Sequence, residues 1–168
     1  MESLIQSLVE FFQNKIPNEL TVFIVSLLPV LELRGGLIAA TLLKMEPLKA
    51  FIICYIGNML PIPFILLFLR KIFNAMRRSK KLGKVVDKLE KKAEKHRKTI
   101  EKYRSLGLLL LVAIPLPGTG GWTGALVAVI TDIRLRNALP IIALGVLIAG
   151  LIVGALSYGL LGNALGVV

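Results

Sequence analysis

Long apolar blocks are the feature that most constrains how this chain can fold. The blocks cover residues 20–43, 48–69, 106–131 and 138–161 of a 168-residue chain. Hydrophobic residues make up 55% of the sequence and charged residues 18%, whereas soluble domains are about 45–50% apolar and about 25% charged. Blocks of this length are typical of membrane segments, so the sequence predicts an all-α integral membrane protein in one domain, residues 1–168, and no soluble enzyme.

Basic charge is concentrated between the second and third blocks. The chain has 21 Lys and Arg against 10 Asp and Glu, and the whole surplus of +11 lies in residues 70–104. The positive-inside rule therefore predicts that this segment is a cytoplasmic loop. Its apolar residues recur at three- and four-residue steps, which predicts a helix. Either its Lys and Arg side chains attract anionic lipid headgroups, or it is a plain solvated cytoplasmic helix. It has few interleaved aromatic residues and no nucleic-acid motif, so we expect no nucleic-acid partner.

The two halves of the chain share a plan. In each half an apolar segment is broken by Pro and a Gly pair, and a cleaner span follows. The matching breaks are Leu28-Pro29 with Gly35-Gly36, and Ile114-Pro115 with Gly120-Gly121. Pro removes a backbone donor, and freed backbone groups cannot face lipid. The pattern thus predicts two inverted repeats, residues 20–69 and 105–168, each a re-entrant hairpin plus a transmembrane helix. The alternative is that all four blocks span the membrane.

The first residues, 1–18, have an apolar stripe at helical spacing. This predicts an amphipathic helix that lies in the membrane interface or, alternatively, packs on the rest of the protein.

Two charged residues stand inside an apolar block, Glu32 and Arg34. Ionisable residues at membrane depth are costly and point to function. If the segment ending in Gly35-Gly36 is unwound, both side chains can face one cavity. Arg34 offers planar donors that suit phosphate or carboxylate, and Glu32 can exchange a proton. The alternative is a buried structural ion pair.

The second break supplies backbone amides, two hydroxyl groups and one aromatic ring, but no charge. A Gly-rich turn that leads into a helix favours an anionic group. We therefore expect the substrate to contact Pro115, Thr119, Gly120, Gly121, Trp122 and Thr123, together with Glu32, Arg34, Gly35 and Gly36. Asn58 and Asp132 are secondary polar candidates, and Asp132 is a second candidate for proton coupling.

Catalytic and metal-ligand sets are missing from the sequence. The chain has one His, His96, one Cys, Cys54, and one carboxylate within the apolar blocks. We therefore expect no enzyme, no cofactor and no metal. Gly150-xxx-Gly154 and Gly162-xxx-Gly166 permit close helix packing, either between the two halves or in a homodimer. We expect a homodimer, because four membrane elements are few for a complete transport path.

Two motifs carry a resemblance to a known family, Pro29-Val-Leu-Glu-Leu-Arg-Gly-Gly36 and Pro115-Leu-Pro-Gly-Thr-Gly-Gly-Trp-Thr-Gly-Ala125. Together they resemble the prokaryotic small multidrug export protein family over nearly the whole chain and, more remotely, the DedA superfamily. The resemblance implies a multi-pass inner-membrane protein with two opposed re-entrant hairpins. DedA relatives are implicated in moving polyprenyl-phosphate carrier lipid, and Glu32 matches the acidic residue of their first hairpin. The arginines of their second hairpin are absent here.

These observations favour a proton-coupled transporter of an amphiphilic, lipid-linked anionic substrate. A cation or drug exporter is the first alternative and needs Glu32 alone as counter-charge. The second is a non-transporting membrane organiser, in which the basic helix binds a cytoplasmic partner or lipid.

Overall fold

The computed structural model describes residues 2–12, 16–78, 97–116 and 118–162. These parts contain helices and no strand, which confirms the all-α prediction. The helices are α1 (Glu2–Phe12), α2 (Asn18–Leu27), α3 (Glu32–Leu42), α4 (Pro47–Met59), α5 (Ile62–Arg78), α7 (Arg97–Ala113), α8 (Gly121–Ile130) and α9 (Leu135–Leu156), with a π-helical turn (Ser157–Gly162) after α9.

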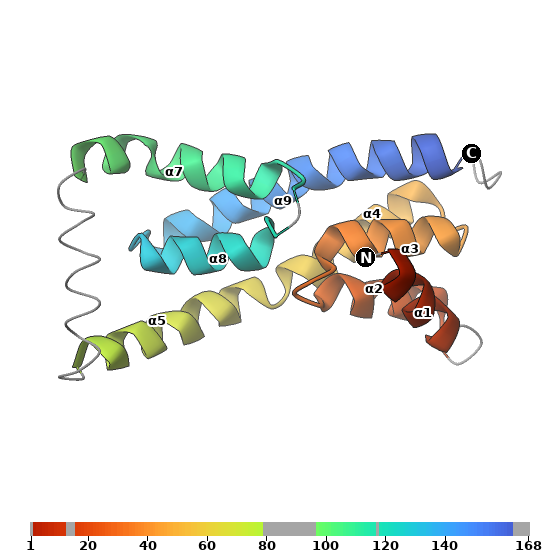
Figure 1. Cartoon of the computed structure of the whole chain (residues 1–168), viewed down its shortest axis with the longest axis horizontal. Helices are drawn as coiled ribbons and strands as arrows, with labels where there is room; N and C mark the ends of the chain where they lie inside the picture. Colours follow the sequence, from red (N-terminus) through yellow and green to blue (C-terminus); the bar gives the residue numbers. More distant parts are fainter. Residues whose placement is uncertain (1, 13–15, 79–96, 117, 163–168) are drawn as a thin grey trace.

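Two helical hairpins, α2–α3 and α7–α8, point toward each other along the long axis of the molecule (Figure 1). Their tips, residues 28–31 and residues 114–116 with 118–120, meet near the middle. The α9 helix runs the length of the molecule and packs on both hairpins, through α3 on one side and α7 and α8 on the other. The α4 and α5 helices follow one another in the opposite direction to α9, on either side of a break at Pro61.

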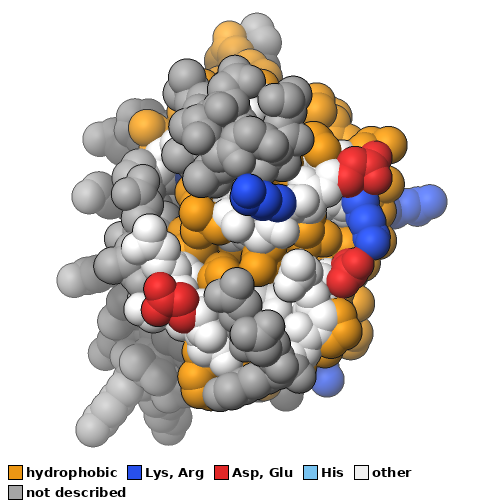
Figure 2. Space-filling view, turned by 90° about the vertical axis from the view of Figure 1, so that its right-hand side faces the viewer, with side chains coloured by type: hydrophobic (Ala, Val, Ile, Leu, Met, Phe, Trp, Pro, Cys, Tyr) orange, Lys and Arg blue, Asp and Glu red, His pale blue; other side chains and the backbone are white. Residues whose placement is uncertain are grey.

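Two stretches, Pro47–Ile72 and Leu135–Gly159, are long and apolar enough to cross a membrane. Less than a third of their most apolar windows is buried inside the protein, so most of these side chains face outward, unlike those of a soluble core helix. Exposed charged residues lie at the ends of the molecule. At the end seen in Figure 2, charged side chains stand among hydrophobic ones. An apolar middle between charged ends is the arrangement expected of a membrane protein.

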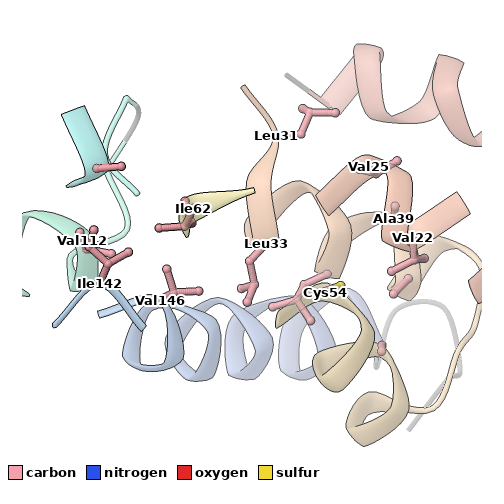
Figure 3. Packing of buried hydrophobic residues seen from close by; sticks show 14 of the residues in the cluster. Val22, Val25, Leu31, Leu33, Ala39, Cys54, Ile62, Val112, Ile142 and Val146 are labelled. Carbon is pink, nitrogen blue, oxygen red and sulfur yellow. The ribbon is translucent and has the colours of Figure 1, made fainter. Parts of the chain in front are cut away.

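Small residues let the helices approach each other closely. A Cβ on Gly150 of α9 would stand 2.9 Å from Leu33 Cδ2 and 2.8 Å from Phe51 Cε2. In Figure 3 the Leu33 side chain points toward α9. Gly150 therefore packs within the chain, and so does Gly154, which faces Leu37. The Gly150-xxx-Gly154 motif therefore packs α9 against α3 and α4, which agrees with the predicted alternative of packing between the two halves. The Gly162-xxx-Gly166 motif extends beyond the described residues.

The outer segments, residues 1–18 and 70–104, are described in part. The first helix ends at Phe12, and its Ile5 and Val9 side chains are buried against the core, as in the packing alternative. Residues 70–78 and 97–104 are helical, as expected of the basic segment, and they are continuous with α5 and α7. The remainder of the basic segment, including His96, lies outside the described residues.

Candidate functional site

Glu32 joins the tip of the first hairpin to the start of α8. Its Oε2 accepts a hydrogen bond from the Gly121 N–H at 3.0 Å, and its Oε1 accepts one from the Trp122 N–H at 3.2 Å. The side chain is 6% exposed. The first N–H groups of a helix have no partner within the helix and carry partial positive charge. The Glu32 carboxylate therefore acts as an N-terminal cap supplied by the opposite hairpin.

Arg34 makes the reciprocal contact with the loop of the second hairpin. Its Nη1 donates to Leu116 O at 2.5 Å, and its Nη2 donates to Thr119 Oγ1 at 3.0 Å and to Ile114 O at 3.4 Å. A planar guanidinium can address several acceptors at once. Together with the Glu32 contacts, these bonds form what we term the hairpin junction, made by Glu32, Arg34 and residues 114–116 and 118–122.

The hydroxyl groups of the second break shape its loop. Thr119 Oγ1 lies 2.8 Å from both Ile114 O and Leu116 O, and it accepts from the Leu116 N–H at 3.2 Å. Thr123 Oγ1 donates to Gly118 O at 2.9 Å. The Thr119 hydroxyl thus contacts both the loop backbone and Arg34. The Thr123 hydroxyl contacts the loop backbone. Pro115, which is partly exposed, belongs to the same loop.

An unwound segment was the condition under which Glu32 and Arg34 were expected to face one cavity. Both residues do line one cavity, but the segment that carries them is helical. Both lie in the first turn of α3, and they reach the opposite hairpin rather than each other. Glu32 has φ of +53°, a left-handed conformation that a non-Gly residue rarely adopts. Such conformations cluster at functional sites. Since Glu32, the first residue of α3, departs from helical geometry, its side chain and that of Arg34 can contact the same loop.

The ion pair found among the described residues is Lys49–Glu19, at 2.6 Å on the surface.

Gly120 is required by the close approach of the Glu32 carboxylate. It has φ of +143°, and a Cβ at this position would stand 1.9 Å from Glu32 Oε2. Gly35 and Gly36, which were predicted to contact the substrate, are closely packed in the structure. A Cβ on Gly35 would meet Leu31, and one on Gly36 would meet Ser26, so both are packing positions within the first hairpin.

A small cavity opens beside the junction. Its polar lining comes from Glu32, Arg34, Asn58 and the Gly120 backbone, and its apolar lining from Leu33, Val112, Val146 and Ala149. It is about the size of one water molecule. Asn58 was predicted only as a secondary polar group, yet it lies at the junction and is 1% exposed. Trp122 is partly buried, and its indole Nε1 has no hydrogen-bond partner in the described parts of the chain.

Asp132 lies away from the junction. It follows α8, whose ten residues separate it from Gly121 by about 15 Å at 1.5 Å per residue. Its carbonyl oxygen lies 3.5 Å from Arg104 Nη1, and the neighbouring Ile133 O accepts a hydrogen bond from Arg70 Nη2. The structure thus places Asp132 in a basic end of the molecule and does not bring it to Glu32.

The acceptors for Arg34 include residues that the sequence analysis missed. Ile114 and Leu116 take part through their carbonyl groups. An apolar side chain carries no sign of such a role. The one available signal was the prolines at 115 and 117, which leave neighbouring carbonyl groups without helical donors.

This arrangement defines the class: a helical membrane protein with two opposed hairpins, in which charged side chains from the tip of one hairpin bind backbone and hydroxyl groups at the tip of the other. Residues 32–152 match a family model described as "Putative small multi-drug export protein". The chain belongs to this family, a family of membrane transporters. The matched region contains the whole of the second motif and residues 32–36 of the first. No curated protein and no solved structure matches the chain.

Replacing Arg34 by Lys should weaken the junction. A single ammonium group cannot reproduce the fork that reaches Leu116 O, Thr119 Oγ1 and Ile114 O, so we expect the free energy of unfolding to fall by about 1 kcal/mol. Thermal unfolding in detergent measures this. The matched control, Lys49→Arg, alters an exposed pair and should change stability by less than about 0.5 kcal/mol. Equal melting of Arg34→Lys and wild type would show that the fork is unimportant.

Proposed function

We propose that this protein is a proton-coupled transporter that moves an amphiphilic molecule with an anionic, lipid-linked headgroup across the inner membrane, and that the hairpin junction is its substrate site. One observation carries the proposal. The Glu32 carboxylate accepts hydrogen bonds from the N-terminal amides of α8, the groups that an anionic headgroup would bind. The guanidinium of Arg34 belongs to the next residue but one along α3.

Three of the four hairpin arms, all except the 17-residue α7, are short, which supports a re-entrant arrangement. The α2 and α3 helices have 10 and 11 residues, and α8 has 10. At 1.5 Å per residue each is about 15 Å long, half of the roughly 30 Å hydrocarbon core. In this proposal the hairpins enter from opposite membrane faces, as inverted repeats do, and the junction lies near the midplane.

Exchange of one anion for another provides the coupling. With Glu32 ionised, its carboxylate holds Gly121 N–H and Trp122 N–H and excludes an external anion. A proton taken up from water by Glu32 removes this charge and weakens both hydrogen bonds. The headgroup can then take the amides and accept hydrogen bonds from Arg34. Release of the proton restores the carboxylate, which displaces the headgroup.

Transport in proteoliposomes tests the proposal. The probe is a fluorescent polyprenyl phosphate in the bilayer, whose exposure on each leaflet is read by a membrane-impermeant quencher. We expect wild-type protein to equilibrate the probe between leaflets, faster with a pH gradient. Arg34→Ala should slow it at least about tenfold, the equivalent of one lost hydrogen bond to a charged group. Glu32→Gln should remove the gradient dependence. Glu19→Gln, on an exposed surface pair, is the control and should behave as wild type.

Two other results would overturn the proposal. If a cationic dye is moved in place of the phosphate and Arg34→Ala is tolerated, the protein is a cation exporter that uses Glu32 as counter-charge. If neither probe moves, while removal of residues 79–96 abolishes the cellular function, the membrane organiser is the better account.

A further inference from the structure

Asn58 is buried at the same cavity as Glu32 but belongs to another helix. It lies on α4, near the break that precedes α5. Its Nδ2 is 3.5 Å from the point where a Cβ on Gly121 would stand, and the Gly121 N–H is the group that Glu32 Oε2 holds at 3.0 Å. The carboxamide and the carboxylate therefore flank the first residue of α8.

The Asn58 carbonyl oxygen has no hydrogen-bond partner within the described part of the protein. Buried polar atoms are almost always paired, and an unpaired one is costly, so an exception calls for an explanation. The apolar neighbours at this cavity, Val112, Val146 and Ala149, cannot donate. An isolated acceptor in such surroundings is complementary to a hydrogen-bond donor.

Ionised Glu32 cannot be that donor, because a carboxylate only accepts. Arg34 is the charged side chain that acts on Glu32, and both of its Nη atoms are engaged with the loop of the second hairpin. Apart from Glu32 and Arg34, the cavity lining consists of Asn58, Gly120 and apolar side chains, none of which titrates. Protonation of Glu32 would create a new donor facing the cavity, its carboxylic O–H.

We infer that Asn58 is the positioning residue for the protonated state of Glu32. In this state the Glu32 hydroxyl turns from the α8 amides toward the cavity, and Asn58 Oδ1 accepts its hydrogen bond across a space that has room for one bridging water molecule. Asn58 thereby stabilises the form of Glu32 that has released Gly121 and Trp122. The inference rests on the proposed function, in which Glu32 carries the proton.

Infrared difference spectroscopy of the full-length protein in liposomes, between acidic and alkaline pH, tests the inference without any substrate. The protonated Glu32 carboxyl gives a C=O band that is identified by its absence in Glu32→Gln. In Asn58→Leu, which is close to Asn in volume, we expect this band to move to higher wavenumber. We also expect its titration midpoint to fall by about one pH unit, because an ordinary hydrogen bond to the protonated form is lost.

Asn58→Ala, which adds no volume, should show the same rise in wavenumber and the same fall in titration midpoint. It replaces Asn58→Leu in the test if the Leu variant folds poorly. Thr41→Val is the matched control, since Thr41 is equally buried but already bonded to Leu37 O at 2.9 Å, and its band should match wild type. A Glu32 band that is unchanged in both Asn58 variants would overturn the inference and leave the proton site intact. If wild type and Glu32→Gln give the same spectrum, the proton site of the proposed function fails, and the role of Asn58 fails with it.

Discussion

Glu32→Ala is expected to separate the hairpin tips and to destabilise the protein more than any other single change at the junction. The substitution removes both acceptors of the α8 N-terminus and leaves Gly121 N–H and Trp122 N–H buried without partners. Hydrogen bonds to charged groups contribute about 1.5–3 kcal/mol each, so we expect the free energy of unfolding to fall by about 3–6 kcal/mol. Thermal or denaturant unfolding in detergent measures the change.

Two further variants make this result specific. Glu32→Gln keeps a carbonyl oxygen that can hold one of the two amides, so about half of the loss should return. Glu19→Ala removes a carboxylate from an exposed ion pair with Lys49 and should change stability by no more than about 1 kcal/mol. If Glu32→Ala unfolds at the wild-type midpoint, the carboxylate is not the cap that joins the hairpins.

The sequence was sufficient to identify the two halves of the site, and for a physical reason. Glu32 and Arg34 stood out because charges are expensive inside an apolar block. The glycines and prolines of residues 115–121 stood out because they end helices and expose backbone groups. Each signal is local, and each appears in the structure at the tip of its own hairpin.

The pairing between these halves could not be read from the sequence. Glu32 and Gly121 are 89 positions apart, and the acceptors of Arg34 are largely backbone carbonyl groups, which every residue has. The left-handed φ of Glu32 was equally hidden, because Gly or Asn would normally be expected there. Asn58 was undervalued for a related reason. A lone amide in an apolar segment is distinguished only when its neighbours in space are known.

The roles of the glycine pairs show the same limit. Gly120 and Gly36 look alike in sequence, each within a Gly-Gly step after a proline. In the structure, Gly120 admits the Glu32 carboxylate, whereas Gly36 lies where α2, α3 and α4 converge. Only the first serves the junction directly; the second fixes the hairpin that carries Glu32 and Arg34.

Gly36→Ala is the second change for which we expect a large effect. A Cβ at this position would stand 1.9 Å from Ser26 Oγ, 2.8 Å from Cys54 Sγ and 3.2 Å from Ser26 Cβ. Ser26 cannot move away freely, because its hydroxyl donates to Val22 O at 2.8 Å and the side chain is fully buried. Overfilling a packed core costs about 1–3 kcal/mol, and we expect the upper part of this range since two neighbouring helices must shift.

A double variant distinguishes this clash from a general effect of the extra methyl group. Ser26→Ala removes the nearest atom, so Gly36→Ala combined with Ser26→Ala should be more stable than the sum of the single changes predicts, with a coupling of about 1 kcal/mol. Gly107→Ala is the matched control. Gly107 lies in α7 with no atom within 4 Å of its would-be Cβ, so Ala should leave stability unchanged or raise it by up to about 1 kcal/mol. Additive losses in the double variant would mean that α2 and α3 do not pack through Ser26 and Gly36, and the position of Glu32 and Arg34 would then need another explanation.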